Sequence, residues 1–355
     1  MPSSRRRRSS PIWQVFGPVP AVVAEAVDAA GSGKNGMGAR RVSEWMRAGA
    51  SPAAESNAAP ALSRAELKQV AIVSGKGGTG KTSIAASFAA LATEKVLADC
   101  DVDAANLHLL LHPEVRQRQE FHGAKVAFRD ASACRACGEC ERRCRFAAIT
   151  REKVDVHACQ GCGLCVLACP NHALALETVA CGEFFLSDSR YGPMAHARLY
   201  PGGESSGRLV TEVRRHAEVM AMGANLRLIL IDGPPGIGCS ATAALVDVDL
   251  AVVVTEPTPA AQHDMLRLLL LLKHFGIPAA VILNKADLDD ANRQSILQMC
   301  EAMGATVIAQ VPFDDAVTRA IAAGRPLIEV DEGPAARAIQ DAWAATCQLL
   351  ECATI

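Results

Sequence analysis

The 355-residue sequence has few aromatic residues, no long apolar run and almost no net charge. Aromatic side chains make up only 4% of it, which argues against stacking platforms for single-stranded nucleic acid. The formal net charge is -2, so a globally basic nucleic-acid-binding protein is not expected. The longest dense apolar run, Leu268 to Leu272, is far shorter than the ~20 residues of a membrane span. What remains is the composition of a folded protein of two or three domains, at ~150 residues each.

Cysteine is the residue type that stands out. The chain has 14 cysteines, and eight of them fall between positions 134 and 169. A disulfide scaffold is typical of small secreted domains, and the sequence has no clean secretory signal. Dense Cys-x-x-Cys repeats in a reducing compartment are instead typical of metal or cluster sites. The sequence therefore predicts a cytoplasmic protein with a local metal or cluster site.

Residues 1–66 differ in composition from the rest of the chain. Ala, Ser, Pro and Gly occupy 35 of these 66 positions, which leaves too little apolar surface to drive ordering. The run Arg5 to Arg8 fits a nucleic-acid or membrane contact, a targeting signal or a solvated tail. We expect residues 1–66 to be a disordered extension or the product of a start assigned too early, with Met37 and Met46 as later starts.

From Lys68 onward, short apolar segments alternate with helical stretches. Segments rich in Val, Ile and Leu without alternation are predicted as buried strands at Gln69–Val73, Lys95–Ala98, Leu228–Ile231, Leu250–Thr255, Ala279–Leu283 and Thr306–Gln310. Such strands are typical of a doubly wound, mostly parallel sheet in an α/β protein. About 130 residues separate the second and third strands, far more than an ordinary connection, and the clustered cysteines lie there. We therefore predict one domain made of residues 67–120 and 181–355, with an inserted domain at 121–180.

A phosphate-binding loop follows the first predicted strand. The motif G-x-x-x-x-G-K-[ST] is complete and stands between a strand and a helix. Its glycines let backbone N–H groups converge on phosphates, Lys81 is placed to reach the β- and γ-phosphates, and the Thr82 hydroxyl to bind Mg²⁺. The predicted nucleotide-binding residues of this segment are Gly75, Lys76, Gly77, Gly78, Thr79, Gly80, Lys81, Thr82 and Ser83.

The second lysine of this loop, Lys76, carries a family resemblance. The string Lys-Gly-Gly-Thr-Gly-Lys-Thr resembles the deviant Walker motif of the MinD/ParA family, which includes the nitrogenase iron protein and the Mrp-type cluster carriers. The resemblance implies a P-loop ATPase that binds ATP with Mg²⁺ and forms a homodimer with nucleotide at the interface. It also implies that Lys76 crosses to the phosphates of the partner subunit, where a cation would stabilise developing charge.

Two further segments fit the same family. Leu97 to Leu107 resembles the motif in which an aspartate orients the attacking water, and by position this is Asp101, with Asp99 as the alternative. Leu228 to Gly236 resembles a Walker B strand that runs into a switch loop, where Asp232 would hold the Mg²⁺ shell. The predicted catalytic residues are Lys76, Lys81, Asp101 and Asp232.

Residues 284–287 are ambiguous in base preference. They read as N-K-x-D, the guanine signature of small GTPases, in which Asp287 would accept hydrogen bonds from guanine. The family resemblance implies adenine instead, with Asn284 at the base edge, and we adopt that assignment.

The eight clustered cysteines form the bacterial ferredoxin run twice, as C-x2-C-x2-C-x3-C. In such two-cluster domains the fourth cysteine of each run binds the other cluster. The predicted ligands of one [4Fe–4S] cluster are Cys134, Cys137, Cys140 and Cys169, and those of the other are Cys159, Cys162, Cys165 and Cys144. The alternative, a pair of Cys₄ zinc sites, usually shows two Cys-x-x-Cys hooks across a longer loop. One departure is Arg145, which stands where such a run normally carries proline.

These observations predict an ATP-hydrolysing protein in which nucleotide state is coupled to electron transfer through two [4Fe–4S] clusters. Its partner would be a redox or cofactor-maturation protein. One alternative is an iron–sulfur or metallocofactor assembly carrier of the Mrp type, although eight ligands from one chain favour permanently held clusters. A weaker alternative is a positioning ATPase like ParA and MinD, and neither nucleic acid nor membrane is an expected partner.

Overall fold

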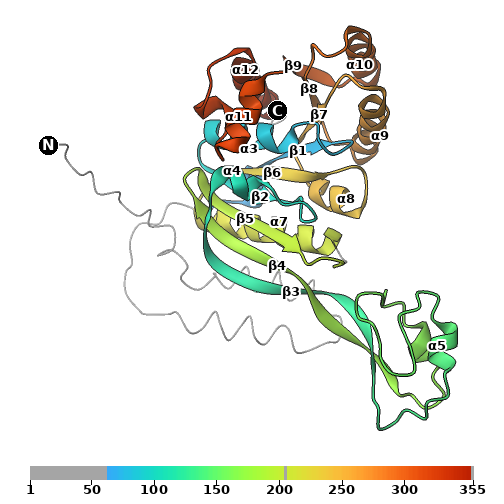
Figure 1. The fold of residues 1–355 in the computed structure, drawn as a ribbon. Coiled ribbons are helices and arrows are strands. Elements are labelled where there is room, and N and C mark those ends of the chain that lie inside the picture. Colours follow the sequence, from blue (N-terminus) through green and yellow to red (C-terminus); the bar gives the residue numbers. More distant parts are fainter. Residues whose placement is uncertain (1–61, 204–205, 353–355) are drawn as a thin grey trace, which may run out of the picture.

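The computed structural model describes residues 62–203 and 206–352, so the predicted extension at 1–66 lies almost wholly outside the described residues. The centre of the fold is a nine-stranded sheet of order β3-β4-β5-β2-β6-β1-β7-β8-β9 (Figure 1). The six strands expected from the sequence are present as β1 (Lys68–Ser74), β2 (Lys95–Asp99), β6 (Leu228–Pro235), β7 (Leu250–Thr255), β8 (Ala279–Asn284) and β9 (Thr306–Val311). They pair in parallel throughout, which confirms the predicted α/β fold with a mostly parallel sheet.

Helices cover both faces of the sheet and bury two apolar cores. One core takes side chains from α7 (Ser206–Gly223), α8 (Cys239–Leu245), α9 (Pro259–Phe275) and α10 (Asp290–Met303). The other takes them from α3 (Lys81–Leu91), α4 (Leu107–Leu111), α11 (Asp315–Ala322) and α12 (Pro334–Cys352). Two short 3₁₀ turns, η2 (Arg64–Glu66) and η3 (Leu327–Glu329), flank these elements. Because the strands are buried on both sides, they read as continuous apolar runs in the sequence.

Three strands of the sheet were not predicted. β3 (Glu114–Arg129) and β4 (Leu174–Ser189) form a long antiparallel ribbon, and β5 (Gly192–Leu199) returns antiparallel to β4 and pairs in parallel with β2. The first half of β3 is mostly exposed, and its charged residues hide the strand pattern that a buried sheet would show. The ribbon crosses both predicted domain boundaries, at 120 and at 180, and joins the two regions as one continuous structure.

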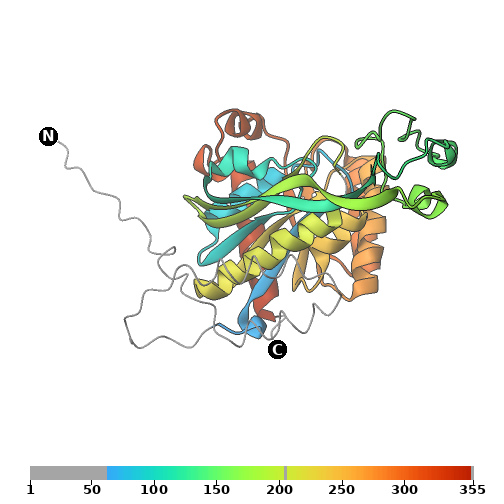
Figure 2. The same cartoon turned by 90° about the horizontal axis from the view of Figure 1, so that it is seen from below.

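The cysteine-rich segment lies at the far end of this ribbon, beyond the edge of the main sheet (Figures 1 and 2). It contains two short helices, α5 (Glu139–Arg143) and α6 (Leu164–Ala168), and a small apolar core of its own. Residues with positive φ recur 25 positions apart, at 136 and 161, 138 and 163, and 147 and 172. The segment therefore folds as two copies of one backbone unit, as the repeated cysteine run predicts.

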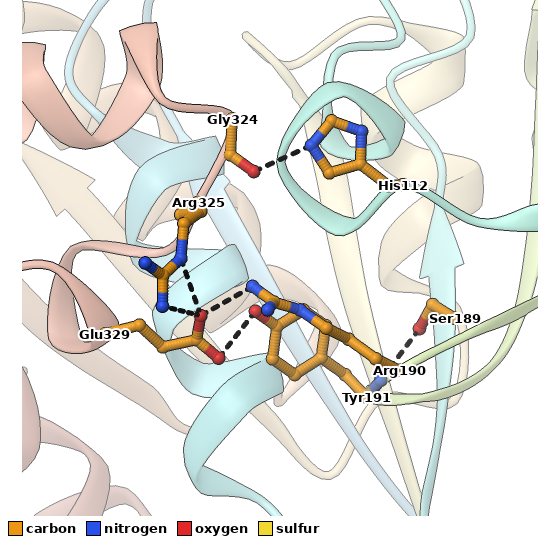
Figure 3. A network of polar contacts seen from close by, with 7 residues as sticks. All are labelled: His112, Ser189, Arg190, Tyr191, Gly324, Arg325 and Glu329. Atoms are coloured by element: carbon orange, nitrogen blue, oxygen red, sulfur yellow. Dashed lines mark hydrogen bonds and ion pairs between the residues drawn. The ribbon is translucent and has the colours of Figure 1, made fainter. Parts of the chain in front are cut away.

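The hairpin between β4 and β5 is fastened to the C-terminal part of the fold (Figure 3). Glu329 accepts hydrogen bonds from the Tyr191 hydroxyl (2.8 Å) and from the guanidinium groups of Arg190 and Arg325. Nearby, the His112 Nε2 and the carbonyl of Gly324 are 2.9 Å apart. These contacts fix the base of the ribbon to the core, while its other end carries the cysteines.

None of the described helices is at once long and apolar enough to cross a membrane.

Candidate functional site

The phosphate-binding loop lies between the carboxyl end of β1 and the start of α3. Gly80 precedes the helix with φ of 92°, and a Cβ there would lie 2.3 Å from the Asn284 Nδ2 atom. A Cβ at Gly75 would lie 2.5 Å from the backbone of Asp264 on α9. Only glycine fits either position, so the loop needs glycine both for its conformation and for its packing.

Lys81 lies at the centre of a buried cluster of carboxylates. Its Nζ is 2.7 Å from Asp232 Oδ1 and 3.5 Å from Asp101 Oδ2, and the Asp232 side chain is only 1% exposed. Burial opposes the charge of Lys81, but the two carboxylates outweigh burial and raise its pKa. The structure therefore brings together three of the four predicted catalytic residues, from α3, β6 and the segment after β2.

Two buried polar atoms at this place have no hydrogen-bond partner within the described protein. They are Asp232 Oδ2 and Thr79 Oγ1. Buried polar atoms without partners are rare, and an unmet carboxylate oxygen is suited to a hydrated divalent cation. Thr82, which follows Lys81 on the first turn of α3, is half-buried beside them. The donor set thus fits Mg²⁺ held through Thr82 and Asp232.

Asp99 and Asp101 have different environments. Asp99 is fully buried, and its carboxylate accepts hydrogen bonds from the backbone N–H of Asp101 (3.2 Å) and of Leu107 (3.3 Å). Burial, followed by the nearby charge of Asp232, raises its pKa well above the ordinary value. Asp101 is partly accessible and faces Lys81. Asp99 therefore organises the loop, and Asp101 is the more accessible of the two carboxylates.

Lys76 is paired within its own chain. Its Nζ is 2.8 Å from Glu256 Oε1, while Lys285 Nζ is 2.7 Å from Glu256 Oε2 and 3.3 Å from the Gly78 carbonyl. Glu256 is buried, yet the two lysines lower its pKa against the effect of burial. Glu256 was not among the predicted site residues. The signal that could have indicated it is a charged residue directly after the buried strand β7.

Asn284 and Asp287, the two residues that bear on the choice between adenine and guanine, both form hydrogen bonds within the protein. The Asn284 Nδ2 donates to the Thr79 carbonyl at 2.8 Å, which ties β8 to the phosphate-binding loop. The Asp287 Oδ1 accepts the backbone N–H of Phe313 at 2.6 Å. One oxygen of Asp287 thus joins two loops of the protein, and the base assignment stays a prediction.

The eight clustered cysteines line two separate pockets. The first four-cysteine pocket is lined by Cys134, Cys137, Cys140 and Cys169, and the second by Cys144, Cys159, Cys162 and Cys165. Each pocket thus takes three cysteines from one run and the fourth from the other. All eight are free thiols. These are the same two sets that the spacing of the runs predicts.

Backbone donors approach one sulfur in each pocket. The Ala173 N–H points to Cys169 Sγ and the Ala127 N–H to Cys159 Sγ, both at 3.3 Å. Such contacts stabilise thiolates. Within residues 62–203 and 206–352, no group of three or more His, Cys, Asp or Glu side chains is arranged to hold a single metal ion.

Comparison with known proteins defines the family. The sequence profile described as CobQ/CobB/MinD/ParA nucleotide binding domain matches residues 70–327. The uncharacterized protein MJ0578 of Methanocaldococcus jannaschii is 32% identical over 260 residues, which cover 72% of this chain and 88% of that protein. A putative septum site-determining protein MinD of Mesostigma viride is 27% identical over 274 residues, covering 74% and 77%.

A solved structure shares the fold. The septum site-determining protein MinD of Pyrococcus horikoshii, complexed with Mg-ADP, aligns with a TM-score of 0.50 and 18% identity over 81% of this chain and 98% of that one. The profile match spans β1 through η3, and the phosphate-binding loop lies within it. The chain therefore belongs to the CobQ/CobB/MinD/ParA family of nucleotide-binding proteins.

Proposed function

We propose that this protein is an ATPase in which the nucleotide state controls electron transfer through two [4Fe–4S] clusters held by residues 130–176. The observation that carries the proposal is the pair of four-cysteine pockets, each built from both cysteine runs. Crosswise sharing of the fourth ligand is the arrangement expected of a two-cluster ferredoxin domain. A bound [4Fe–4S] cluster supplies one-electron chemistry, and the inserted segment would be the ferredoxin-like domain.

The spacing of the cysteine runs favours clusters over zinc. Structural Cys₄ zinc sites usually pair two Cys-x-x-Cys hooks across a longer loop. Three cysteines at i, i+3 and i+6 with a fourth from the other run are instead the ligand pattern of a two-cluster ferredoxin domain. The roles of the eight cysteines as cluster ligands remain part of this proposal.

At the nucleotide site, the proposed roles follow from position and charge. Lys81 neutralises the β- and γ-phosphates, and Thr82 with Asp232 holds Mg²⁺. Asp101 orients the attacking water, since it is the accessible carboxylate of its loop. When Mg²⁺ and nucleotide bind together, Lys81 would exchange a carboxylate partner for phosphate, and Mg²⁺ would replace Lys81 as the counter-charge of Asp232.

Lys76 gives the site its proposed dependence on dimerisation. Its pairing with Glu256 holds the Lys76 ammonium at the site in the single chain. In a nucleotide-bound homodimer, Lys76 would leave Glu256 and contact the phosphates of the partner subunit. A cation supplied across an interface contributes roughly 10³-fold or more to phosphoryl transfer in comparable sites.

The connection between the two sites supports coupling. The loop that begins at Asp101 is tied at both ends to Asp99, leads into α4 and continues after two residues into β3. β3 then runs without interruption to the cysteine-rich segment. A change of the loop on nucleotide binding would therefore reach the clusters along one continuous segment of the chain.

A second candidate is a positioning ATPase. Similarity to the putative septum site-determining protein MinD of Mesostigma viride favours it, and the family relationships support this candidate better than electron transfer. The cysteine pockets favour the first candidate, since positioning requires no redox centre. An Mrp-type cluster carrier is the third candidate and would release its clusters to an acceptor protein.

Metal analysis of anaerobically purified protein tests the first proposal. We expect about eight irons and about eight acid-labile sulfides per chain, the content of two cubanes. Cys169→Ser should damage the cluster that also uses Cys134, whereas Cys239→Ser, an exposed cysteine outside both pockets, should leave the content unchanged. Zinc without sulfide would contradict the proposal.

Nucleotide-dependent measurements then separate the candidates. Coupling predicts that ATP shifts the reduction potential of the clusters or their accessibility to an iron chelator, with iron retained. A carrier predicts transfer of iron and sulfide to an apo-acceptor. A positioning ATPase predicts ATP-dependent binding to DNA or to lipid vesicles with no change in the clusters.

A further inference from the structure

The surface beside the second four-cysteine pocket is positively charged. The pocket is lined by the arginines Arg143 and Arg145, and no carboxylate is among its lining residues. Arg143 is paired with Glu139 at 2.7 Å. Arg145, which replaces the usual proline of the run, is exposed and lies over the Phe146 ring at 5.2 Å. Among the described residues, Arg145 has no carboxylate partner and presents its charge at the edge of this pocket.

Exposed leucines lie next to this cation. Leu164 lines the same pocket and is 42% exposed, and Leu167, three positions later on α6, is 86% exposed. Residues three apart on a helix share a face, so the two leucines form one apolar strip. A nearly fully exposed leucine beside a charged rim is the composition of a protein contact more than of a solvated surface.

The first four-cysteine pocket also carries arginines but differs in its apolar surface. It is lined by Arg129, Arg135 and Arg151 and by Glu139 and Glu141, of which Glu139 is paired with Arg143. No exposed large apolar side chain is among its lining residues. The asymmetry points to the second pocket as the side from which another protein approaches.

We infer that Arg145, Leu164 and Leu167 form a docking face for an acidic one-electron carrier protein. The inference rests on the proposed function, because it assumes a cluster in the second pocket. Carboxylates on the carrier would pair with Arg145 around a central contact on the two leucines. The exchange moves one electron between this protein and the carrier, so one is oxidised as the other is reduced and no bond or proton moves.

Other occupants fit the face less well. An anionic membrane would also attract arginine and leucine, but α6 has only five residues and gives no extended amphipathic helix for interfacial binding. A second copy docking through the same face would add another Arg145 to the contact, with no carboxylate among the residues that line the second pocket to pair with it. An acidic protein satisfies both the charge and the apolar strip.

Calorimetric titration with a strongly acidic plant-type [2Fe–2S] ferredoxin tests the inference, with both proteins oxidised. Binding should weaken between about 0.05 M and about 0.5 M salt, because screening shortens the reach of exposed charges. Arg145→Glu should weaken binding about tenfold, or about 1.4 kcal/mol. Leu167→Gln should weaken it several-fold with less change in the salt dependence. Basic cytochrome c should not bind.

Matched variants distinguish ferredoxin binding at this face from general electrostatic attraction between the two proteins. Arg151→Glu makes the same charge change at the first pocket, and Leu270→Gln removes an equally apolar side chain that is 51% exposed on α9. Both should bind the ferredoxin like the wild type. Iron and sulfide content is measured for every variant, and Arg145→Gln replaces Arg145→Glu if the latter loses its clusters.

Failure of the docking face can be distinguished from failure of the proposed function, because the iron and sulfide content alone tests the proposed function. With both clusters present, absence of ferredoxin binding overturns the docking face. Equal loss with Arg151→Glu and Arg145→Glu also overturns it. Binding of phosphatidylglycerol vesicles that depends on Leu167, or self-association that Leu167→Gln abolishes, would assign the face to a membrane or to a second copy instead.

Discussion

Replacement of Lys81 by methionine tests the charge balance of the nucleotide site. Lys81 bridges two carboxylates, and within the described residues it is the cation paired with Asp232. Lys81→Met keeps the length of the side chain but leaves Asp232 buried without a counter-charge. Breaking a buried ion pair from one side costs about 3–5 kcal/mol. The nucleotide-free protein should be destabilised by that amount.

Replacing Asp232 should destabilise the protein less than replacing Lys81, because Lys81 has two carboxylate partners. In Asp232→Asn, Lys81 keeps Asp101 as a second carboxylate at 3.5 Å, so its charge stays compensated. The double variant removes both members of the closest pair and should recover most of the stability lost in Lys81→Met, since uncharged replacement of a buried pair is often near neutral. The cycle should therefore show strong non-additivity, of about 2 kcal/mol or more.

The assay is anaerobic chemical unfolding of the full chain without nucleotide, followed by circular dichroism for the four members of the cycle. Lys81→Met should also lose the extra affinity that the γ- and β-phosphates give to ATP over adenosine. If Lys81→Met unfolds like the wild type, or if Asp232→Asn fails to restore stability in the Lys81→Met background, Lys81 and Asp232 do not form the buried pair on which the site is built.

Three further predictions concern catalysis, base choice and acid stability. The variants Lys76→Ala and Asp101→Asn should each bind ATP but hydrolyse it slowly. Mixing the two variants should restore partial ATPase activity in mixed dimers. No recovery in proven mixed dimers would show that Lys76 does not act across the interface. Because Asp287 is bound to Phe313, ATP should bind more tightly than GTP, and a tenfold preference for GTP in competition binding would reverse the base assignment. Burial, with the nearby charges of His108 and Arg198, lowers the pKa of His196 to about 4, so between about pH 6.5 and 4 only the unfolded chain takes up this proton. The free energy of unfolding should then fall on acidification by up to about 3 kcal/mol because of this residue. His196→Gln can retain the contact with Ser187, and its stability should change less between pH 7 and pH 5 than that of the wild type. An equal change in both proteins would exclude His196 as the source.

Local sequence order was sufficient for the nucleotide-binding half of the fold. The phosphate-binding loop is contiguous, and its glycines, Lys81 and Thr82 act through positions fixed within one strand, one loop and one helix. The six parallel strands are recognisable because burial on both faces removes polar residues from them. The division of the eight cysteines into two sets also follows from spacing, and the pockets repeat that division. Whether clusters occupy them stays a prediction.

Contacts between distant segments were decided only by the tertiary structure. The β3–β4 ribbon was missed because its exposed half carries Arg and Gln on both faces, so neither alternation nor an apolar run marks it. The contrast between Asp99 and Asp101 depends on burial, which two aspartates two residues apart in sequence do not reveal.

Pairing of residues far apart in sequence has the same origin. The sequence predicts that Lys76 acts on a partner, but its contact with Glu256, 180 positions away, exists only because β1 and β7 are neighbours in the sheet. The contact of Tyr191 with Glu329 likewise arises where a hairpin tip meets the C-terminal turn (Figure 3). Motifs whose residues lie within one strand and the loop after it can be recognised in the sequence. Contacts between residues that the strand order brings together depend on the packing of the whole sheet.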